Sequence, residues 1–164
     1  NDGKMVIFSD GKIEQLDNEY SNRIRKIRGI SSNEVYAGCD DGLLLQFDGF
    51  KWKKFKQFPE EIRLFALQTF KENGKTIIFA GGDYGIAYIF DGEQWKKTTT
   101  GAGTRIWNFW GTKSDNVYAA TYNYCDFYHY DGKEWKKISL PESKTHFYSV
   151  VGSNDNGLFA VSYG

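Results

Sequence analysis

The sequence has little of several features that mark whole classes of protein. It has two cysteines and two histidines, without metal-ligand spacing, which predicts neither a disulfide framework nor a metal site. No apolar run reaches the roughly 18 residues of a membrane-spanning helix. Basic and acidic residues number 21 each, so the basic excess of nucleic-acid binders and membrane tethers is missing. We therefore expect no metal, cofactor, nucleic-acid partner or membrane insertion.

Aromatic residues, by contrast, make up 18% of the chain, and many of them lie in a repeat. An Asp-Gly pair followed by Trp-Lys-Lys occurs three times, and a shorter copy near the start has isoleucine in place of tryptophan and lacks one residue. These segments are residues 47–54, 90–97, 130–137 and 9–13. Self-similarity at a fixed period of about forty residues is typical of repeat architectures.

Each copy is predicted to form four short strands, named A to D. Strand A is expected at 24–28, 64–68, 106–110 and 147–151, and strand B around 35–38, 78–81, 117–120 and 158–161. The B segments are apolar at consecutive positions, which indicates burial on both faces. Strand C runs into Asp-Gly and strand D contains Trp-Lys-Lys. Asp-Gly is typical of a type I′ hairpin turn, because both central residues of that turn need positive φ.

The repeat spacing predicts how many units the chain contains. Arg23, Arg63, Arg105 and His146 stand at equivalent positions, separated by 40, 42 and 41 residues. The 19 residues from His146 onward and the 22 residues before Arg23 make a fourth unit of 41. We therefore predict an all-β β-propeller, a single domain over 1–164. Its four four-stranded blades are 23–62, 63–104, 105–145, and 146–164 together with 1–22.

The last blade would be closed by strands from both termini, with residues 158–162 pairing with residues 5–8. Closure hides sheet edges that would otherwise invite aggregation. Two alternatives stay open. The chain could be part of a larger ring cut at a blade boundary, or two chains could complete an eight-bladed ring.

The pattern Trp-Asn-Phe-Trp-Gly-Thr-Lys-Ser-Asp-Asn-Val-Tyr-Ala at 107–119, followed by Tyr-Asp-Gly-Lys-Glu-Trp at 130–135, resembles tandem bacterial propeller repeats of unassigned role. Such repeats are found in many secreted and surface proteins, so the resemblance favours an extracellular or periplasmic location. It also implies that strand A lines a central channel, with the D–A and B–C connections on one face.

That placement puts Arg23, Arg63, Arg105 and His146 at the channel mouth. Converging guanidinium groups suit a carboxylate, sulfate or phosphate, because arginine offers a planar donor fork. The alternative is structural, each arginine pairing with an acidic loop residue of a neighbouring blade, such as Glu61, Asp40 or Asp83. The B–C loops add residues typical of surfaces that read sugars or peptides; either at least two of them are exposed, or they pack at strand ends. These residues are Tyr84, Tyr122, Tyr124, Tyr163, Asn123 and Asp2.

The tryptophans divide into two groups. Those of strand D, Trp52, Trp95 and Trp135, are predicted to wedge the outer strand against the neighbouring blade. Trp107 and Trp110 on strand A are expected to fill channel-side or inter-blade volume, and only secondarily to stack on a ligand.

The function predicted from these features is non-catalytic recognition at the channel mouth, with a glycan, an acidic small molecule or a peptide as the ligand. A scaffold or protein–protein assembly domain of a larger protein or oligomer is the alternative. A glycoside hydrolase is the third hypothesis, but no Tyr–Glu nucleophile pair can be identified by spacing. No Gly-rich phosphate loop or Ser–His–Asp arrangement indicates another enzyme class.

Overall fold

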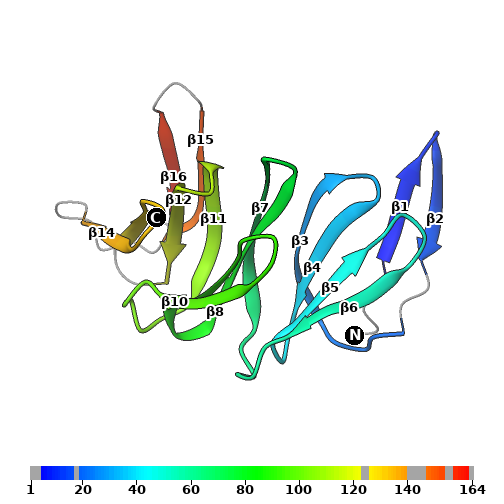
Figure 1. Ribbon diagram of the computed structural model, residues 1–164, viewed down its shortest axis with the longest axis horizontal. Helices are drawn as coiled ribbons and strands as arrows, with labels where there is room; N and C mark the ends of the chain where they lie inside the picture. Colours follow the sequence, from blue (N-terminus) through cyan, green and yellow to red (C-terminus); the bar gives the residue numbers. More distant parts are fainter. Residues whose placement is uncertain (1–4, 17–18, 123–125, 140–146, 154–156, 163–164) are drawn as a thin grey trace. The chain divides into compact units, whose positions relative to one another are not determined.

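The computed structural model describes residues 5–16, 19–122, 126–139, 147–153 and 157–162 (Figure 1). This part of the chain is all-β, with sixteen strands and one short 3-10 turn, η1 (Asp83–Gly85). None of its segments is a helix long and apolar enough to cross a membrane. The predicted fold class is therefore confirmed at the level of secondary structure.

The strands form three four-stranded antiparallel sheets, each built from consecutive strands that follow the predicted A-to-D order. The first blade contains β3 (Ile24–Ser31), β4 (Glu34–Cys39), β5 (Leu43–Phe47) and β6 (Trp52–Gln57). The second contains β7 (Leu64–Glu72), β8 (Lys75–Gly82), β9 (Ile86–Phe90) and β10 (Trp95–Thr99). The third contains β11 (Ile106–Lys113), β12 (Asn116–Thr121), β13 (Asp126–Tyr130) and β14 (Trp135–Ser139).

Two hairpins lie at the ends of the described chain, β1 (Met5–Ser9) with β2 (Lys12–Leu16), and β15 (Phe147–Gly152) with β16 (Leu158–Ser162). Each is a separate two-stranded sheet. The chain divides into two compact units, Asn1–Leu64 and Phe65–Gly164, with one hairpin in each. The union of the hairpins in a fourth blade, and with it the single domain, stays a prediction.

The core of the second unit lies between the second and third blades. Ile78, Phe79 and Ala80 on strand B are all fully buried, which confirms that this strand buries both faces. Trp135 on β14 stacks on Phe109 at 5.8 Å between ring centroids and meets Phe79 of the second blade edge-on at 6.4 Å. Trp135 therefore wedges its outer strand against the neighbouring blade, as predicted.

The C–D turns are where expected, but the predicted turn type is wrong for the three complete blades. In the first blade, Phe47 pairs with Trp52, so Asp48 and Gly49 are the first two residues of a four-residue loop. Gly49 has a φ of 97°, whereas Asp48 is not among the residues with positive φ. Its carboxylate accepts hydrogen bonds from the amides of Phe50 and Lys51, both at 3.0 Å. Aspartate here caps the turn with its side chain.

The shorter N-terminal copy does form the predicted turn. Phe8 pairs with Ile13 and Ser9 with Lys12, which places Asp10 and Gly11 at the tip with φ values of 50° and 73°. Between the equivalent pairs Phe8–Ile13 and Phe47–Trp52, the missing residue moves the Asp-Gly pair one position along, and the additional pair Ser9–Lys12 shortens the loop from four residues to two. That shift converts a side-chain-capped turn into one with two left-handed residues.

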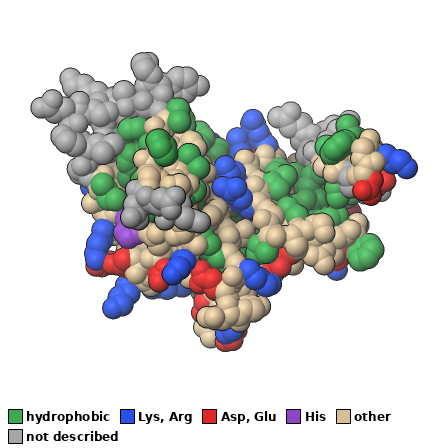
Figure 2. All heavy atoms as spheres, turned by 90° about the horizontal axis from the view of Figure 1, so that it is seen from above, with side chains coloured by type: hydrophobic (Ala, Val, Ile, Leu, Met, Phe, Trp, Pro, Cys, Tyr) green, Lys and Arg blue, Asp and Glu red, His purple; other side chains and the backbone are tan. Residues whose placement is uncertain are grey.

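The β1–β2 hairpin packs on the first blade through Met5 and Ile7. Its other face leaves Val6, Phe8 and Ile13 between 64% and 72% exposed, and Figure 2 shows uncovered hydrophobic side chains over this hairpin. A groove of about 700 Å³, lined mainly by apolar residues, runs along β1 and the first blade. Hydrophobic surface of this kind is usually covered by another element.

Candidate binding site

A β-bulge recurs near the start of strand A. The pairing of strand A with strand B skips one residue at Arg25 in the first blade, at Trp107 in the third and at Tyr148 in the terminal hairpin. Phe65 stands at the same repeat position in the second blade. Because a bulge leaves one residue unpaired and turns its side chain in a new direction, it is a common device beside binding sites.

In the second unit this position gathers aromatic rings around Trp107. Phe65 on β7 meets the Trp107 ring edge-on, with 4.9 Å between centroids. Tyr148 on β15 lies 5.9 Å away, and Tyr122, directly after β12, lies 6.1 Å away. The cluster therefore joins three successive A strands and one B–C connection, from positions about forty residues apart in the sequence.

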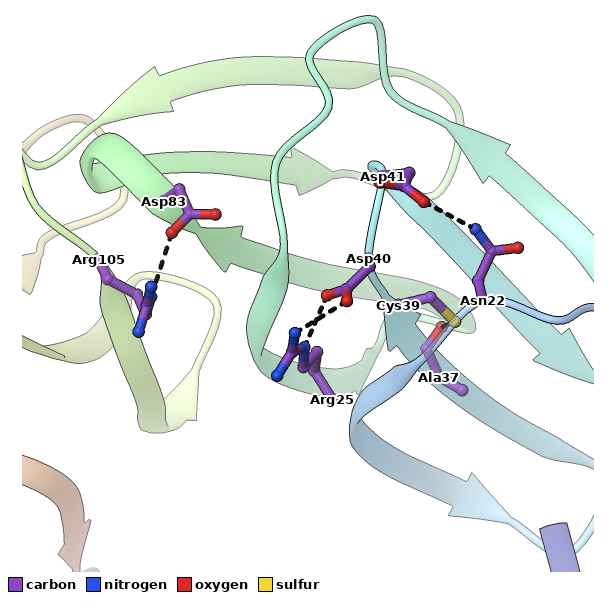
Figure 3. A network of polar contacts seen from close by, with 8 residues as sticks. All are labelled: Asn22, Arg25, Ala37, Cys39, Asp40, Asp41, Asp83 and Arg105. Carbon is purple, nitrogen blue, oxygen red and sulfur yellow. Dashed lines mark hydrogen bonds and ion pairs between the residues drawn. The ribbon is translucent and has the colours of Figure 1, made fainter. Parts of the chain in front are cut away.

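Arg105 is held within this cluster. The central carbon of its guanidinium group, Cζ, lies 4.2 Å from the centre of the Phe65 ring and 4.7 Å from that of Trp107. Its Nε donates to Asp83 Oδ1 at 3.1 Å (Figure 3). The two terminal guanidinium nitrogens make no hydrogen bond with any residue that the structure describes. Arg105 is thus oriented by its neighbours while most of its donors stay unused.

Two further polar groups close to Arg105 in the chain lack partners. Within the described residues, Thr104 Oγ1 and Trp107 Nε1 are buried and make no hydrogen bond. The indole nitrogens of Trp52 and Trp135 share this condition. Leaving such a group unpaired inside a protein costs about 1–3 kcal/mol, so a ligand that supplies an acceptor would recover that energy.

Asp83 is presented by a left-handed turn between β8 and β9. Tyr84 and Gly85 have φ values of 61° and 68°, and the amide of Thr100 donates to Gly85 O at 2.9 Å. The first blade repeats this geometry, with φ values of 59° and 71° at Asp41 and Gly42. A tyrosine in this conformation is unusual, because bulky side chains avoid positive φ. The Tyr84 side chain is nevertheless 69% exposed, so burial of the ring does not explain why a tyrosine occupies this position.

The first unit has its own ion pair at the bulged position. Arg25 binds Asp40 in a bidentate contact (Figure 3). Its Nε donates to Oδ1 at 2.6 Å, and a terminal nitrogen donates to Oδ2 at 2.8 Å. Asp40 is the repeat equivalent of Asp83. The alternative that arginines pair with loop acids is therefore correct for Arg105 with Asp83. For Asp40, however, the partner is Arg25 rather than a residue of the predicted cation set.

Arg23 and Arg63 lie at the same end of the first blade. The amide of Asp40 donates to Arg23 O at 2.9 Å, and the amide of Gly42 donates to the carbonyl of Ile62, next to Arg63, at 2.7 Å. Both arginines are exposed. They belong to the first unit and Arg105 to the second, so the convergence of the predicted cations stays a prediction.

The predicted tyrosines are described in part. Tyr84 and Tyr122 are 69% and 45% exposed, so of the two open possibilities exposure is correct for these two residues. His146, Tyr124 and Tyr163, with Asn123 and Asp2, lie outside the described residues. Sequence reasoning missed the bulged position, although its signal was present: a large side chain stands two residues after each predicted cation. These side chains are Arg25, Phe65, Trp107 and Tyr148.

No protein-family model and no curated protein matches this sequence. Among solved structures, "YCF48 bound to D1 peptide" is similar over 97% of this chain and 54% of its own, with a TM-score of 0.68 and 14% identity. The computationally designed Ika8 protein is similar over 96% of this chain and 54% of its own, with a TM-score of 0.69 and 16% identity.

The extracellular domain of BT4673 from B. thetaiotaomicron is similar over 90% of this chain and 20% of its own, with a TM-score of 0.63 and 17% identity. The chain thus spans about half the length of the first two structures and a smaller part of the third. At these identities the likeness concerns the fold. The fold is a β-propeller.

Proposed function

We propose that this protein is a recognition propeller that binds an acidic peptide segment at Arg105. The proposal rests on the way in which the Arg105 side chain is held. The side chain is fixed between the rings of Phe65 and Trp107 and by Asp83, yet its terminal nitrogens have no partner among the described residues. Those nitrogens form the fork that binds a carboxylate through two parallel hydrogen bonds.

The surroundings favour binding for an entropic reason. An arginine in solution loses side-chain freedom when a ligand immobilises it, at a cost of about 0.5–1.5 kcal/mol. Here the aromatic sandwich and the bond to Asp83 have already restricted Arg105. Only 24% of its side chain is exposed, so solvent screens a bound carboxylate less than it would at an open surface.

A peptide fits the site better than a small anion because the charged group lies among rings. The rings of Tyr122 and Tyr148 lie 6.1 and 5.9 Å from that of Trp107 and enlarge the aromatic surface, and the exposed Tyr84 belongs to the turn that presents Asp83. A peptide with a carboxylate beside an apolar residue would use both kinds of surface. A peptide-bound propeller among the similar structures supports this choice of ligand for the fold.

We further propose that the site is non-catalytic. Asp83, the carboxylate in contact with Arg105, is occupied as the partner of that cation. Turnover of any substrate in a fluorogenic glycoside panel would contradict the non-catalytic proposal.

The resemblance to repeats of surface proteins and the similarity to an extracellular domain support action outside the cytoplasm.

The test is binding of a library of acidic and amidated peptides, followed by calorimetry on the best ligand. Arg105→Gln should weaken binding at least about tenfold, the equivalent of about 1.4 kcal/mol. The control is Lys133→Gln, which also removes one positive charge but at an exposed turn of the third blade. Neutralising the peptide carboxylate should cost as much as Arg105→Gln. Equal losses of affinity in Arg105→Gln and Lys133→Gln would contradict the proposal, as would the absence of binding to any acidic peptide.

A further inference from the structure

A second site lies at the other end of β11, between the A–B turn of the third blade and the facing ends of β15 and β16 at Ser153 and Leu158. It is a pocket of about 150 Å³. Its walls come from β11–β12 on one side and from the β15–β16 hairpin on the other. The lining residues used below are Trp110, Thr112, Asn116, Tyr118 and Ser153. All of them belong to the second unit.

One wall of the pocket is aromatic. Trp110 and Tyr118 are direct cross-strand partners, with their ring centroids 6.0 Å apart, and Tyr118 in turn stacks on His129 at 4.5 Å. The indole is accommodated by Gly152, where a Cβ atom would come within 2.5 Å of the Trp110 ring. The other three copies have Arg28, Gln68 and Val151 at the position of Trp110. The repeat therefore does not require a tryptophan there.

The polar side chains of the pocket are held in defined orientations. Asn116 Oδ1 lies 2.8 Å from His129 Nε2, and Asn116 Nδ2 donates to Thr112 Oγ1 at 3.0 Å. Because an amide oxygen can only accept, His129 Nε2 is the donor in this contact. One Nδ2 proton, together with the hydroxyls of Thr112 and Ser153, remains to bind a ligand. Among the lining residues that the structure describes, none is an aspartate, glutamate, lysine, arginine or histidine.

We infer that this pocket binds a single neutral pyranose ring. A cavity of about 150 Å³ accommodates one six-membered ring. Fixed amide and hydroxyl groups select a ring that carries hydroxyls, and flat aromatic faces contact its apolar side. The absence of charge in the described lining favours a neutral sugar over a sugar acid. This inference concerns a different site from the one at Arg105 and does not rest on the proposed function.

Saturation-transfer NMR with methyl glycosides of glucose, galactose, mannose and N-acetylglucosamine tests the inference, with glucuronic acid, phenol and prolinamide as comparators. Trp110→Gln is the variant of choice, because the second copy carries Gln68 at this position and the strand accepts it. The affinity for the best sugar should fall about tenfold in Trp110→Gln, because the variant removes the aromatic face that contacts the apolar side of the ring. Thr112→Val should also weaken binding.

Trp107→Phe is the control, because Trp107 belongs to the Arg105 cluster, and it should leave sugar binding unchanged. Three results would overturn the inference: no transfer to any neutral sugar, equal losses in Trp110→Gln and Trp107→Phe, or tighter binding of phenol or prolinamide than of every sugar. Sugar binding that persists in Arg105→Gln while peptide binding is lost would show that the two sites are independent.

Discussion

At the scale of single residues, Tyr84 is the clearest departure from what the backbone prefers. Its φ of 61° suits glycine, asparagine or aspartate, and the equivalent residue of the first blade is Asp41 at 59°. A strained residue with an exposed side chain is more readily explained by binding than by stability. Tyr84 also follows Asp83, the partner of Arg105.

We therefore expect Tyr84→Asn to stabilise the protein by about 1 kcal/mol, because asparagine accepts the left-handed region more readily. Urea denaturation followed by tryptophan fluorescence measures the change. Asp41→Asn is the matched control and should be neutral, since both residues tolerate this backbone. If Tyr84→Asn lowered stability instead, the ring would have a structural role.

At the scale of elements, the C–D turns show why Asp-Gly recurs. A Cβ atom on Gly49, Gly92 or Gly132 would come within about 3 Å of the A–B turn of the same blade, at Asn33, Lys75 and Asp115 respectively. Glycine is thus needed both for its positive φ and for the close approach of two turns. The pair Asp-Gly marks the contact between the two hairpins of a blade.

We predict that Gly132→Ala lowers the free energy of unfolding by more than the replacement of a left-handed glycine alone would. Gly132 has a φ of 89° and its added Cβ would lie 3.0 Å from that of Asp115. Gly101 has a φ of 77° with nothing within 4 Å. Gly101→Ala should cost about 1–2 kcal/mol for the backbone alone, and Gly132→Ala distinctly more. Equal losses in thermal or urea unfolding would rule out the packing contribution.

The aspartates of these turns also predict how stability depends on pH. A hydrogen bond from Lys136, together with amide hydrogen bonds from Glu134 and Lys133, holds the pKa of Asp131 well below its usual range. The pKa of Asp48 is lowered in the same way, with Lys53 as the largest cause. A carboxyl group whose pKa is lowered in the folded state stabilises the fold at pH values above its ordinary pKa of about 4. This stabilisation is lost as the pH falls below that value.

We accordingly expect the free energy of unfolding to decrease between about pH 4 and pH 2. Asp131→Asn keeps the acceptor for the turn amides but removes the ionisable group, so its stability should fall less steeply over this range. Urea titrations at each pH measure the slope. Glu93→Gln, at an exposed residue of the corresponding second-blade turn whose carboxylate pairs with Lys75, serves as the comparison. An unchanged slope in Asp131→Asn would contradict the account.

At the scale of the whole molecule, the terminal hairpins show surfaces that complete blades bury. Val6, Phe8 and Ile13 are 64–72% exposed, whereas the residues in the same places of the first blade are at most 9% exposed. Those residues are Leu45, Phe47 and Trp52. On the other hairpin, Phe159 is 67% exposed, whereas its equivalents Tyr36 and Phe79 are at most 2% exposed and Tyr118 is half-buried. Surfaces of this kind indicate a missing neighbour.

We expect the β1 edge to be covered in solution by a hairpin of the A–B type, as the closure prediction requires. The amides of β1 that do not pair with β2 should then be protected from hydrogen exchange, and Phe8→Ser should remove that protection. Light scattering distinguishes the predicted closure within one chain from the eight-bladed alternative, because the first gives the monomer mass and a ring of two chains gives twice that mass. Fast exchange of these amides would contradict both.

Much of the fold was predictable because residues close together in the sequence determine the strands and turns of each repeat. Consecutive apolar residues mark strand B, and Asp-Gly before Trp marks the C–D hairpin, so four-stranded units followed from residues close in sequence. The turn type was predicted wrongly, since it depends on whether Asp-Gly begins the loop, as at Asp48, or occupies its tip, as at Asp10. A difference of one residue in register decides which backbone conformation is possible.

The candidate site was predictable only in part. The sequence by itself determined the strands, the repeat spacing and the presence of Arg105 at the start of strand A, because these follow from periodicity and spacing. Only the tertiary structure decided that Arg105 lies between Phe65 and Trp107 and bonds to Asp83. That arrangement depends on a bulge in strand A and on contacts across about forty residues. Packing between blades determines which residues meet across such distances, and no local pattern records it.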